Sequence, residues 1–376
     1  MLCAARVCAL QVTVTRLFHP SRANHRHQYC SSTTLHGFSR QGERRSKGRQ
    51  SQQRPQQRTR PTQQVRHNNS SKVSSNKKLE RPEIIFSNNH VLVVNKPAGW
   101  KSQPGDGGGK NNNNQGSNNV DPKCLLTYLQ MQELGGGSQK NFLSPTHRLD
   151  QPCTGVLIFA KNGKAASRIQ VAWAKRNVKK VYWVVVEGGD DGLDFLISRS
   201  KLLNGNEKNP TYKLSGMLKS TGGGGPRGNK GGSRGSVVCK PLPPNQTSSS
   251  NDTSNGFRVC HIEWKHLKTL PSSRHSTNGP RYLLSVSTDT GAKHQVRALL
   301  ALAGRAPIAG DLRYGGSYID GPLPDGSVAL HARSVFLPTV SLGGMDFLSE
   351  KPFIGNLPGR WNEYFGVREQ DVKGLQ

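Results

Sequence analysis

The sequence lacks a hydrophobic run long enough to cross a membrane. Only 33% of its 376 residues are apolar, and no stretch approaches the roughly 20 consecutive apolar residues that a membrane helix requires. This apolar content is low for a globular chain of such length. We therefore expect a protein without membrane contact that has one folded core and several long disordered segments.

Paired cysteines are also missing. The chain has seven cysteines, an odd number, and no C-x-x-C motif occurs among them. This pattern supports neither a disulfide framework nor a zinc site. We expect reduced thiols inside a cell and no metal site.

Acidic residues are scarce. Lys and Arg number 53 against 23 Asp and Glu, which gives a formal net charge of +30. Residues 1–80 contain only two acids, Glu43 and Glu80, but the rest of the chain is basic as well. A charge of this sign over the whole chain favours a polyanionic partner, above all a nucleic acid.

The N-terminal residues 1–80 resemble a targeting segment followed by a basic tract. Arg6 and Arg16 interrupt the apolar stretch, which argues against a secretory signal, and no acid precedes Glu43. Arg- and Ser-rich segments without acids are typical of organellar transit peptides. We expect mitochondrial localisation, with a plastid transit peptide or a cytosolic RNA-binding arm as the alternatives.

Hydrophobic patterning predicts one α+β domain over residues 81–345, built on a mixed, mostly antiparallel sheet with flanking helices. Residues 346–376 would form a C-terminal extension. Gly-, Asn- and Ser-rich composition predicts two insertions without secondary structure, at about 105–119 and 203–257. Strands are expected at 84–86, 91–95, 156–160, 181–186, 258–264, 282–288 and 328–337, and helices at 124–134, 164–176 and 293–303.

Polar side chains interrupt this apolar scaffold in three places. "HRLDQPCTG" at 147–155 contains a lone carboxylate, Asp150. "KVYWVVVEG" at 180–188 places Lys180 and Tyr182 on one strand. "TGAKHQVRALLALAG" at 290–304 contains Arg297 and is followed by "GDLRYGG" at 310–316. A carboxylate kept ionised by a nearby arginine can act as a nucleophile, and a tyrosine can stack on a base or move a proton. These residues alone indicate covalent or acid–base chemistry on a nucleic acid without defining the reaction.

The same segments resemble, in order, the motifs of the RluA-type pseudouridine synthases. "HRLDQPCTGVLIFAK" is similar to the family's H-R-L-D signature with its apolar run, and "NKPAG" at 95–99 matches an earlier motif. "KVYWVVVEG", "TGAKHQVRALLALAGRAPIAGDLRYG" and "LHARSVFLP" resemble three later ones. The resemblance covers roughly residues 83–340. The chain departs from it at Cys153 and Thr154, and at Ala292, where the family has arginine.

The resemblance implies isomerisation of uridine to pseudouridine in ribosomal, transfer or messenger RNA by a monomer, without cofactor or metal. Asp150 matches the catalytic nucleophile, Tyr182 the tyrosine that packs on the base, and Arg297 the arginine that pairs with the aspartate. The further positions expected to contact RNA are His147, Arg148, Lys293 and Arg313.

Several residues and functions have alternative readings. Asp311 is interpreted as a turn cap, and His294 and His331, like His147, as structural or substrate-positioning groups. A glycoside or nucleoside hydrolase would require a second carboxylate near Asp150. A non-catalytic RNA-binding factor is the other alternative, and only Ala292 favours it.

Overall fold

The computed structural model describes residues 80–104, 123–133, 142–188, 193–204, 209–221, 237–242, 256–270, 279–316, 323–337, 345, 348 and 350–372. These residues belong to one compact unit, Ser74–Gln376. The predicted N-terminal segment 1–80, except Glu80, and the insertion at 105–119 lie outside the described residues.

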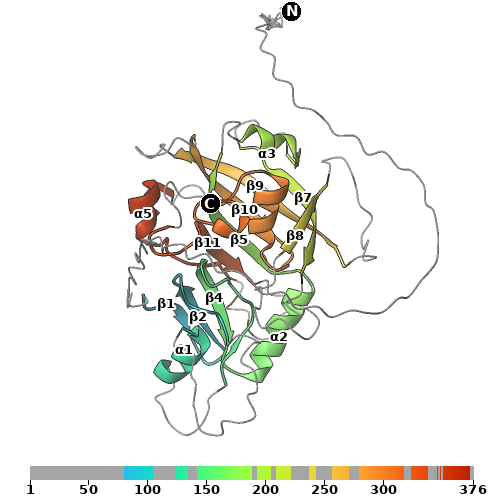
Figure 1. Ribbon diagram of the computed structural model, residues 1–376. Coiled ribbons are helices and arrows are strands. Elements are labelled where there is room, and N and C mark those ends of the chain that lie inside the picture. Colours follow the sequence, from blue (N-terminus) through green and yellow to red (C-terminus); the bar gives the residue numbers. More distant parts are fainter. Residues whose placement is uncertain are drawn as a thin grey trace, which may run out of the picture. The chain divides into compact units, whose positions relative to one another are not determined.

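A mixed, mostly antiparallel sheet forms the centre of this unit (Figure 1). The described strands along its main path run in the order β1-β2-β4-β11-β5-β10-β9-β7-β6. The expected α+β fold is therefore confirmed. The strand bounds are β1 Glu83–Ser87, β2 Val91–Lys96, β3 Ser144–Pro145, β4 Thr154–Ala160, β5 Lys179–Glu187, β6 Ser200–Leu202, β7 Tyr212–Ser220, β8 Val237–Pro241, β9 Arg258–Leu270, β10 Arg281–Thr288, β11 Leu330–Phe336 and β12 Phe353–Ile354.

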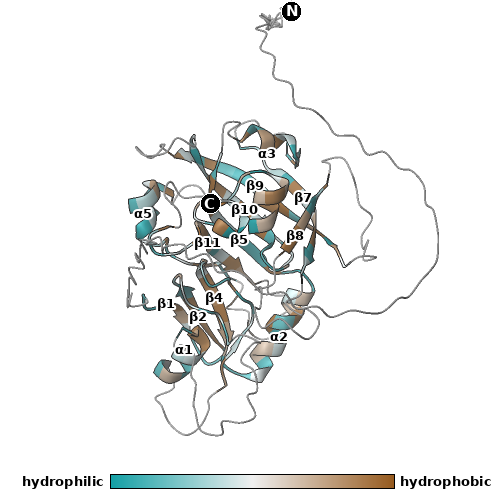
Figure 2. Cartoon of the chain, viewed as in Figure 1, coloured by the Kyte–Doolittle hydropathy of each residue, from teal (hydrophilic) through white to brown (hydrophobic). Residues whose placement is uncertain are grey.

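Two helices cover opposite faces of β2 and β4. Alternate residues of each strand point to opposite faces, and two separate apolar clusters result. Val93 and Ile158 pack with α2, Gly163–Ala174, on one face. Leu92 and Phe159 pack with α1, Leu125–Glu133, on the other. Figure 2 shows β4 as mostly hydrophobic, whereas α2 carries both colours. Burial on both faces explains the uninterrupted apolar run of β4.

The other half of the sheet packs against the helical segment that follows residue 294. Sequence patterning predicts one helix there, at 293–303. The structure has a short α-helix, α4 Gln295–Ala298, continued by a π-helical turn, η1 Leu299–Ala303. The Gly304 N–H donates to the Leu299 carbonyl, five residues earlier, as expected for a π turn. Apart from this change the prediction is confirmed, because the expected apolar stripe is buried.

Strand β11 joins the two halves. It pairs in parallel with β4 and antiparallel with β5. Gly155 allows this close pairing, because its φ is +115° and an added Cβ would lie 2.3 Å from the Ala332 carbonyl oxygen. The turn before β4 and the cleft-facing residues of β5 are thereby brought together.

Two parts of the predicted domain organisation are wrong. The range 203–257 contains β7 and β8, so it is not an insertion without secondary structure. Buried and half-buried residues alternate along β7, but the glycine-rich segments beside the strands dominate the composition of the range. The residues after 345 are not a separate extension, because β12 pairs with β11 and α5, Arg360–Phe365, contributes Trp361 and Phe365 to the core. Helix α3, Asp194–Ser198, was also not anticipated.

None of the described helices has the length and hydropathy needed to cross a membrane.

Candidate active site

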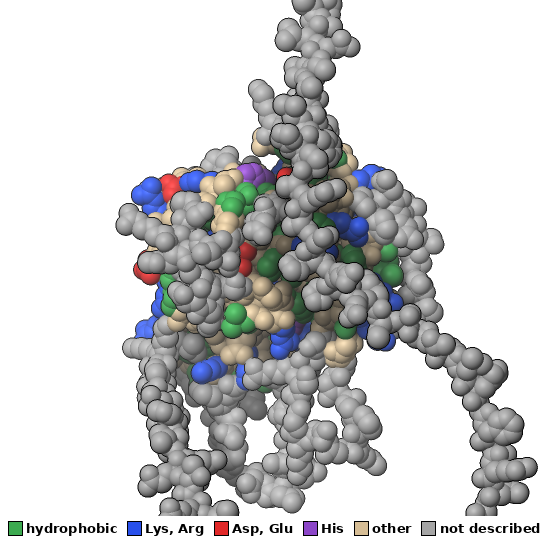
Figure 3. Space-filling model, turned by 45° about the horizontal axis from the view of Figure 1, so that its top comes forward, with side chains coloured by type: hydrophobic (Ala, Val, Ile, Leu, Met, Phe, Trp, Pro, Cys, Tyr) green, Lys and Arg blue, Asp and Glu red, His purple; other side chains and the backbone are tan. Residues whose placement is uncertain are grey.

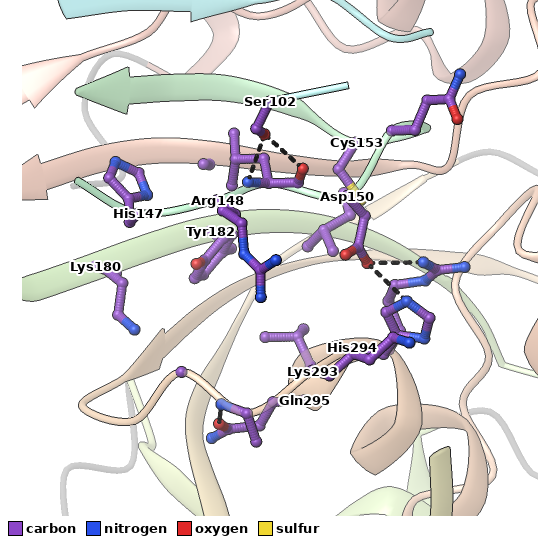
Figure 4. A pocket seen from close by; sticks show the side chains of 18 of the residues that line it. Ser102, His147, Arg148, Asp150, Cys153, Lys180, Tyr182, Lys293, His294 and Gln295 are labelled. Atoms are coloured by element: carbon purple, nitrogen blue, oxygen red, sulfur yellow. Dashed lines mark hydrogen bonds and ion pairs between the residues drawn. The ribbon is translucent and has the colours of Figure 1, made fainter. Parts of the chain in front are cut away.

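A cleft of about 900 Å³ opens where the turn before β4, strand β5 and the loop leading into α4 meet (Figure 4). Asp150, Tyr182 and Arg297, the three residues predicted to carry the chemistry, all line it. The cleft is also lined by Ser102, His147, Arg148, Cys153, Thr154, Trp173, Lys180, Thr290, Gly291, Lys293, His294 and Gln295.

The end of β2 and the loop after it fix the turn that carries Asp150. The buried amine of Lys96 donates to the carbonyl oxygens of Gln151, at 3.2 Å, and Cys153, at 2.6 Å. Ser102 Oγ donates to the Leu149 carbonyl at 2.8 Å and accepts from the Leu149 N–H at 3.0 Å. The motifs at 95–99 and 147–155 therefore form one structural unit around Asp150.

Strand β11 supports the same turn from the other side. His331 is fully buried, with Nδ1 2.9 Å from Thr154 Oγ1 and Nε2 3.0 Å from the Gly355 carbonyl oxygen. Burial lowers the pKa of His331 to about 4, so the ring is neutral. Nε2–H then donates to Gly355, and Nδ1 accepts from Thr154. His331 is structural, in line with its sequence interpretation.

Arg297 connects two carboxylates. Its Nη1 donates to Asp150 Oδ2 at 2.7 Å, which confirms the predicted contact. Its Nε and Nη2 donate to the two carboxylate oxygens of Asp311, at 2.6 and 2.8 Å. Burial opposes the charged form of Arg297, but the hydrogen bonds to Asp311 outweigh it and raise the pKa. The guanidinium is thus a fixed cation beside Asp150.

The interpretation of Asp311 as a turn cap was wrong, because its side chain makes no capping hydrogen bond to the turn that follows. Its carboxylate is 1% exposed and both of its oxygens bind Arg297. The G-D pair at 310–311 gave no sign of this role, because the partner lies on another element. Bidentate pairing sets the orientation of the guanidinium plane, so Asp311 positions the arginine that contacts Asp150.

His294, interpreted from the sequence as a structural or substrate-positioning group, is a second neighbour of Asp150. Its Nε2 lies 3.7 Å from Asp150 Oδ2, and its Nδ1 lies 2.7 Å from the Tyr314 hydroxyl oxygen. Burial lowers the pKa of His294 to about 4, although the charge of Asp150 acts in the opposite direction. Its backbone has a φ of 53°, which is uncommon for a residue other than glycine. Such strain is concentrated at functional sites.

Tyr182 points into the cleft from β5, between Asp150 and Lys180 (Figure 4). Burial raises the pKa of its phenol well above the ordinary value. The hydroxyl is therefore protonated at neutral pH, and the ring offers an apolar face for a base.

The residues expected to contact RNA are only partly collected in the cleft. Arg148 and Lys293 line it and are exposed, whereas Arg313 is exposed but does not line it. His147 lines it as a neutral ring, because burial lowers its pKa to about 3. It accepts a hydrogen bond from the Ile158 N–H at 3.2 Å and contacts Trp173 at 4.9 Å between ring centroids. His147 thus forms part of the wall and offers no positive charge to a phosphate.

Among the described residues, no three His, Cys, Asp or Glu side chains gather in a group that could hold a metal ion. Cys153 lines the cleft, and burial raises the pKa of its thiol to about 12, which disfavours the thiolate. The contact between the Asp150 carboxylate and the Arg297 guanidinium lies at the centre of the site.

Comparison with known proteins agrees with this geometry. The chain is 26% identical over 237 residues to the mitochondrial pseudouridylate synthase RPUSD4 of Xenopus tropicalis, covering 62% of this chain and 60% of that protein. It is 26% identical over 268 residues to the ribosomal large subunit pseudouridine synthase C of Rickettsia typhi, covering 71% and 67%. It thus spans about two thirds or less of the length of these relatives.

Among solved structures, the human RNA pseudouridylate synthase domain containing 4 matches with a TM-score of 0.45 and 19% identity, over 74% of this chain and 89% of that one. The family model for RNA pseudouridylate synthases matches residues 90–302, more than half of the chain. The match includes the segments that carry Asp150, Tyr182 and Arg297, so the chain belongs to the RNA pseudouridylate synthase family.

Proposed function

We propose that this protein isomerises uridine to pseudouridine in RNA, with Asp150 as the nucleophile. The observation that carries the proposal is the 2.7 Å contact between Arg297 Nη1 and Asp150 Oδ2 in a cleft that also contains Tyr182. Arg297 stabilises the ionised carboxylate and directs it, and one side of that carboxylate remains open, since its side chain is 30% exposed. An ionised, oriented and accessible carboxylate can attack a sugar carbon.

The reaction conserves all atoms. The bond between uracil N1 and ribose C1′ breaks, the uracil rotates, and a bond from C5 to C1′ forms. The C5 proton leaves and N1 gains a proton. Asp150 stabilises or bonds C1′ while the base is detached, and the Tyr182 ring holds the base. Because the Tyr182 phenol is protonated, it can take the C5 proton only as it gives up its own.

A hydrolase is disfavoured by the state of the second carboxylate. Asp311 is the second carboxylate that binds Arg297, but it is 1% exposed and both of its oxygens are hydrogen-bonded to Arg297. It does not line the cleft. Asp311 is therefore unable to activate a water against a sugar, which an inverting hydrolase requires.

The surface favours RNA as the substrate. On the face shown in Figure 3, Lys and Arg side chains are more common than Asp and Glu, in keeping with the formal net charge of +30. We also propose mitochondrial targeting by residues 1–80, supported by their basic composition and by the word "mitochondrial" in the name of one relative. Mitochondrial ribosomal RNA is the first substrate to test, because another relative is named for the ribosomal large subunit.

The test is release of tritium from RNA labelled at uridine C5. Asp150→Asn should abolish release while leaving RNA affinity within a few-fold of the native value, because the shape of the side chain is kept. Asp194→Asn is a matched control, since Asp194 is exposed on α3 outside the cleft. Release by Asp150→Asn within tenfold of the native rate would contradict the assignment of the nucleophile.

A further inference from the structure

Lys180 is a buried cation that the proposed reaction does not use. It lies on β5, lines the cleft and is only 7% exposed. Its Nζ donates one hydrogen bond, to the Thr290 carbonyl oxygen at 2.6 Å. Among the residues that the structure describes, no carboxylate lies within ion-pair distance of it. An ammonium group has three donors, and a buried charge without an anionic partner is unfavourable.

The amine occupies the end of the cleft away from Asp150. Figure 4 shows His147 and Lys180 at one end, and Asp150 and His294 at the other. Lys180 Nζ lies 5.3 Å from the centroid of the Trp173 ring. A Cβ on Gly291 would lie 3.9 Å from Nζ, so glycine keeps the approach from that side open. The wall is aromatic and glycine-lined, and a charge enclosed in this way acts strongly on an incoming anion.

Support of the neighbouring loop does not account for Lys180. Gln295 already holds that loop: its Oε1 accepts from Thr290 Oγ1 at 2.9 Å and from the Ala292 N–H at 3.0 Å. Its Nε2 donates to Thr288 Oγ1 at 2.8 Å. A neutral side chain at position 180 could complete this arrangement, so the charge calls for another explanation.

The position of Lys180 relative to Tyr182 indicates the ligand. The two residues are two apart on β5 and point to the same face, about 6.5 Å apart along the strand. A base held by Tyr182 therefore has the ammonium within about one nucleotide step. We propose that Lys180 binds the phosphodiester group of the nucleotide next to the target uridine, in a subsite walled by Trp173 and Gly291. This inference rests on the proposed action on uridine in RNA.

The protonation behaviour of the amine is consistent with this subsite. Burial lowers the pKa of Lys180 to about 8, and the charge of Asp289 only partly opposes the shift. An RNA phosphate would favour the charged form and offset the unfavourable burial.

The experiment removes the charge of Lys180 by substitution and the charge of an RNA phosphate by chemical replacement. The probe is a single-stranded RNA of about ten nucleotides with one uridine, in which a neutral methylphosphonate replaces one phosphate at a time. Binding is measured for the full-length protein, for Lys180→Met and for Lys179→Met. Lys179 is a matched control, because it is the exposed neighbour on the same strand.

A methylphosphonate at one of the two linkages next to the uridine should weaken native binding about tenfold, the usual size of one charge-assisted contact. It should have no further effect on Lys180→Met and the full effect on Lys179→Met. Equal losses for the native protein and Lys180→Met at both linkages would overturn the proposal and leave Lys180 as a support for Thr290.

The native protein provides a test that needs no variant. If a methylphosphonate next to the uridine weakens native binding no more than one four nucleotides away, the proposal is wrong even should Lys180→Met fail to fold. Tritium release distinguishes the hypothesis of a phosphate subsite at Lys180 from the hypothesis that the protein isomerises uridine. Isomerisation without coupling between Lys180 and a phosphate refutes only the subsite. Coupling without release from any RNA refutes the isomerisation and supports the phosphate contact.

Discussion

Asp311→Asn removes the charge that holds Arg297 while keeping the shape of the side chain. In the native protein, Asp311 accepts two hydrogen bonds from the guanidinium and is 1% exposed. An amide keeps one acceptor but turns an NH2 group toward a donor. Arg297 is then left buried with a single anionic partner, Asp150, whose side chain is 30% exposed.

The loss of stability expected for each variant follows from the surroundings of the two carboxylates, Asp311 and Asp150. Breaking a buried ion pair by changing one partner costs roughly 3–5 kcal/mol. The remaining contact with Asp150 favours the lower end, about 3 kcal/mol. At about 2–4 °C per kcal/mol for a domain of this size, Tm should fall by roughly 6–12 °C. Asp150→Asn leaves both Asp311 contacts in place and should cost less, about 1 kcal/mol, because the Asp150 carboxylate is partly solvated.

The assay combines thermal unfolding, followed by circular dichroism, with tritium release from uridine-labelled RNA. Both variants should lose turnover, but only Asp311→Asn should lose much stability. An equal fall in Tm for Asp150→Asn and Asp311→Asn would contradict the greater importance of Asp311 for stability. So would an Asp311→Asn variant that unfolds within about 2 °C of the native protein.

Three further outcomes are expected. Tyr182→Phe should keep RNA affinity in equilibrium binding but lose single-turnover rate, and an unchanged rate would limit Tyr182 to packing. Gly155→Ala should destabilise the fold by roughly 3 kcal/mol or more in urea unfolding, because the new Cβ would lie 2.3 Å from the β11 backbone. Gly163→Ala is the control and should be tolerated, since its new Cβ meets no atom within 4 Å. Equal effects of the two substitutions would contradict the close packing of β4 against β11. Acid should also destabilise the protein. Burial lowers the pKa of His147 to about 3 and that of His331 to about 4. Below about pH 6.5 both histidines are therefore protonated in the unfolded chain but still neutral in the folded one. The free energy of unfolding should then fall toward pH 4 by up to about 2.7 kcal/mol per pH unit, and His331→Gln should reduce this slope.

The sequence predicted the parts of the fold that have strong local patterns. The segments Val156–Ala160 and Val181–Val186 were placed correctly, because strands that are buried mostly on both faces form short, uninterrupted apolar runs. Strands β7 and β8 were missed, since glycine-rich flanks dominate the composition around them. Strand β7 pairs with β9, and β8 pairs with β7, and no local window of sequence reveals either pairing.

The candidate site shows the same limit. Asp150, Tyr182 and Arg297 were found because each lies in a recognisable motif. The bidentate contact between Asp311 and Arg297 was not, although only 14 positions separate the two residues. Whether an aspartate caps a turn or binds a buried guanidinium depends on the direction of the side chain after folding. The neutral state of His147 could not be predicted from the sequence for a related reason, since it results from burial.

The position of β11 late in the chain determines when the active site can assemble during synthesis. The strands before it form two half-sheets, one ending at β4 and the other at β5, and β11 joins them. Asp150 precedes β4, whereas Arg297 follows β10 in the other half. A growing chain that has not yet reached Leu330 holds the carboxylate and the guanidinium on separate bodies, each with an unpaired strand edge. Non-local pairing of this kind forms slowly, so we expect the cleft to be the last part of the protein to form. A chain truncated before β11 would then carry every motif of the family without an assembled active site.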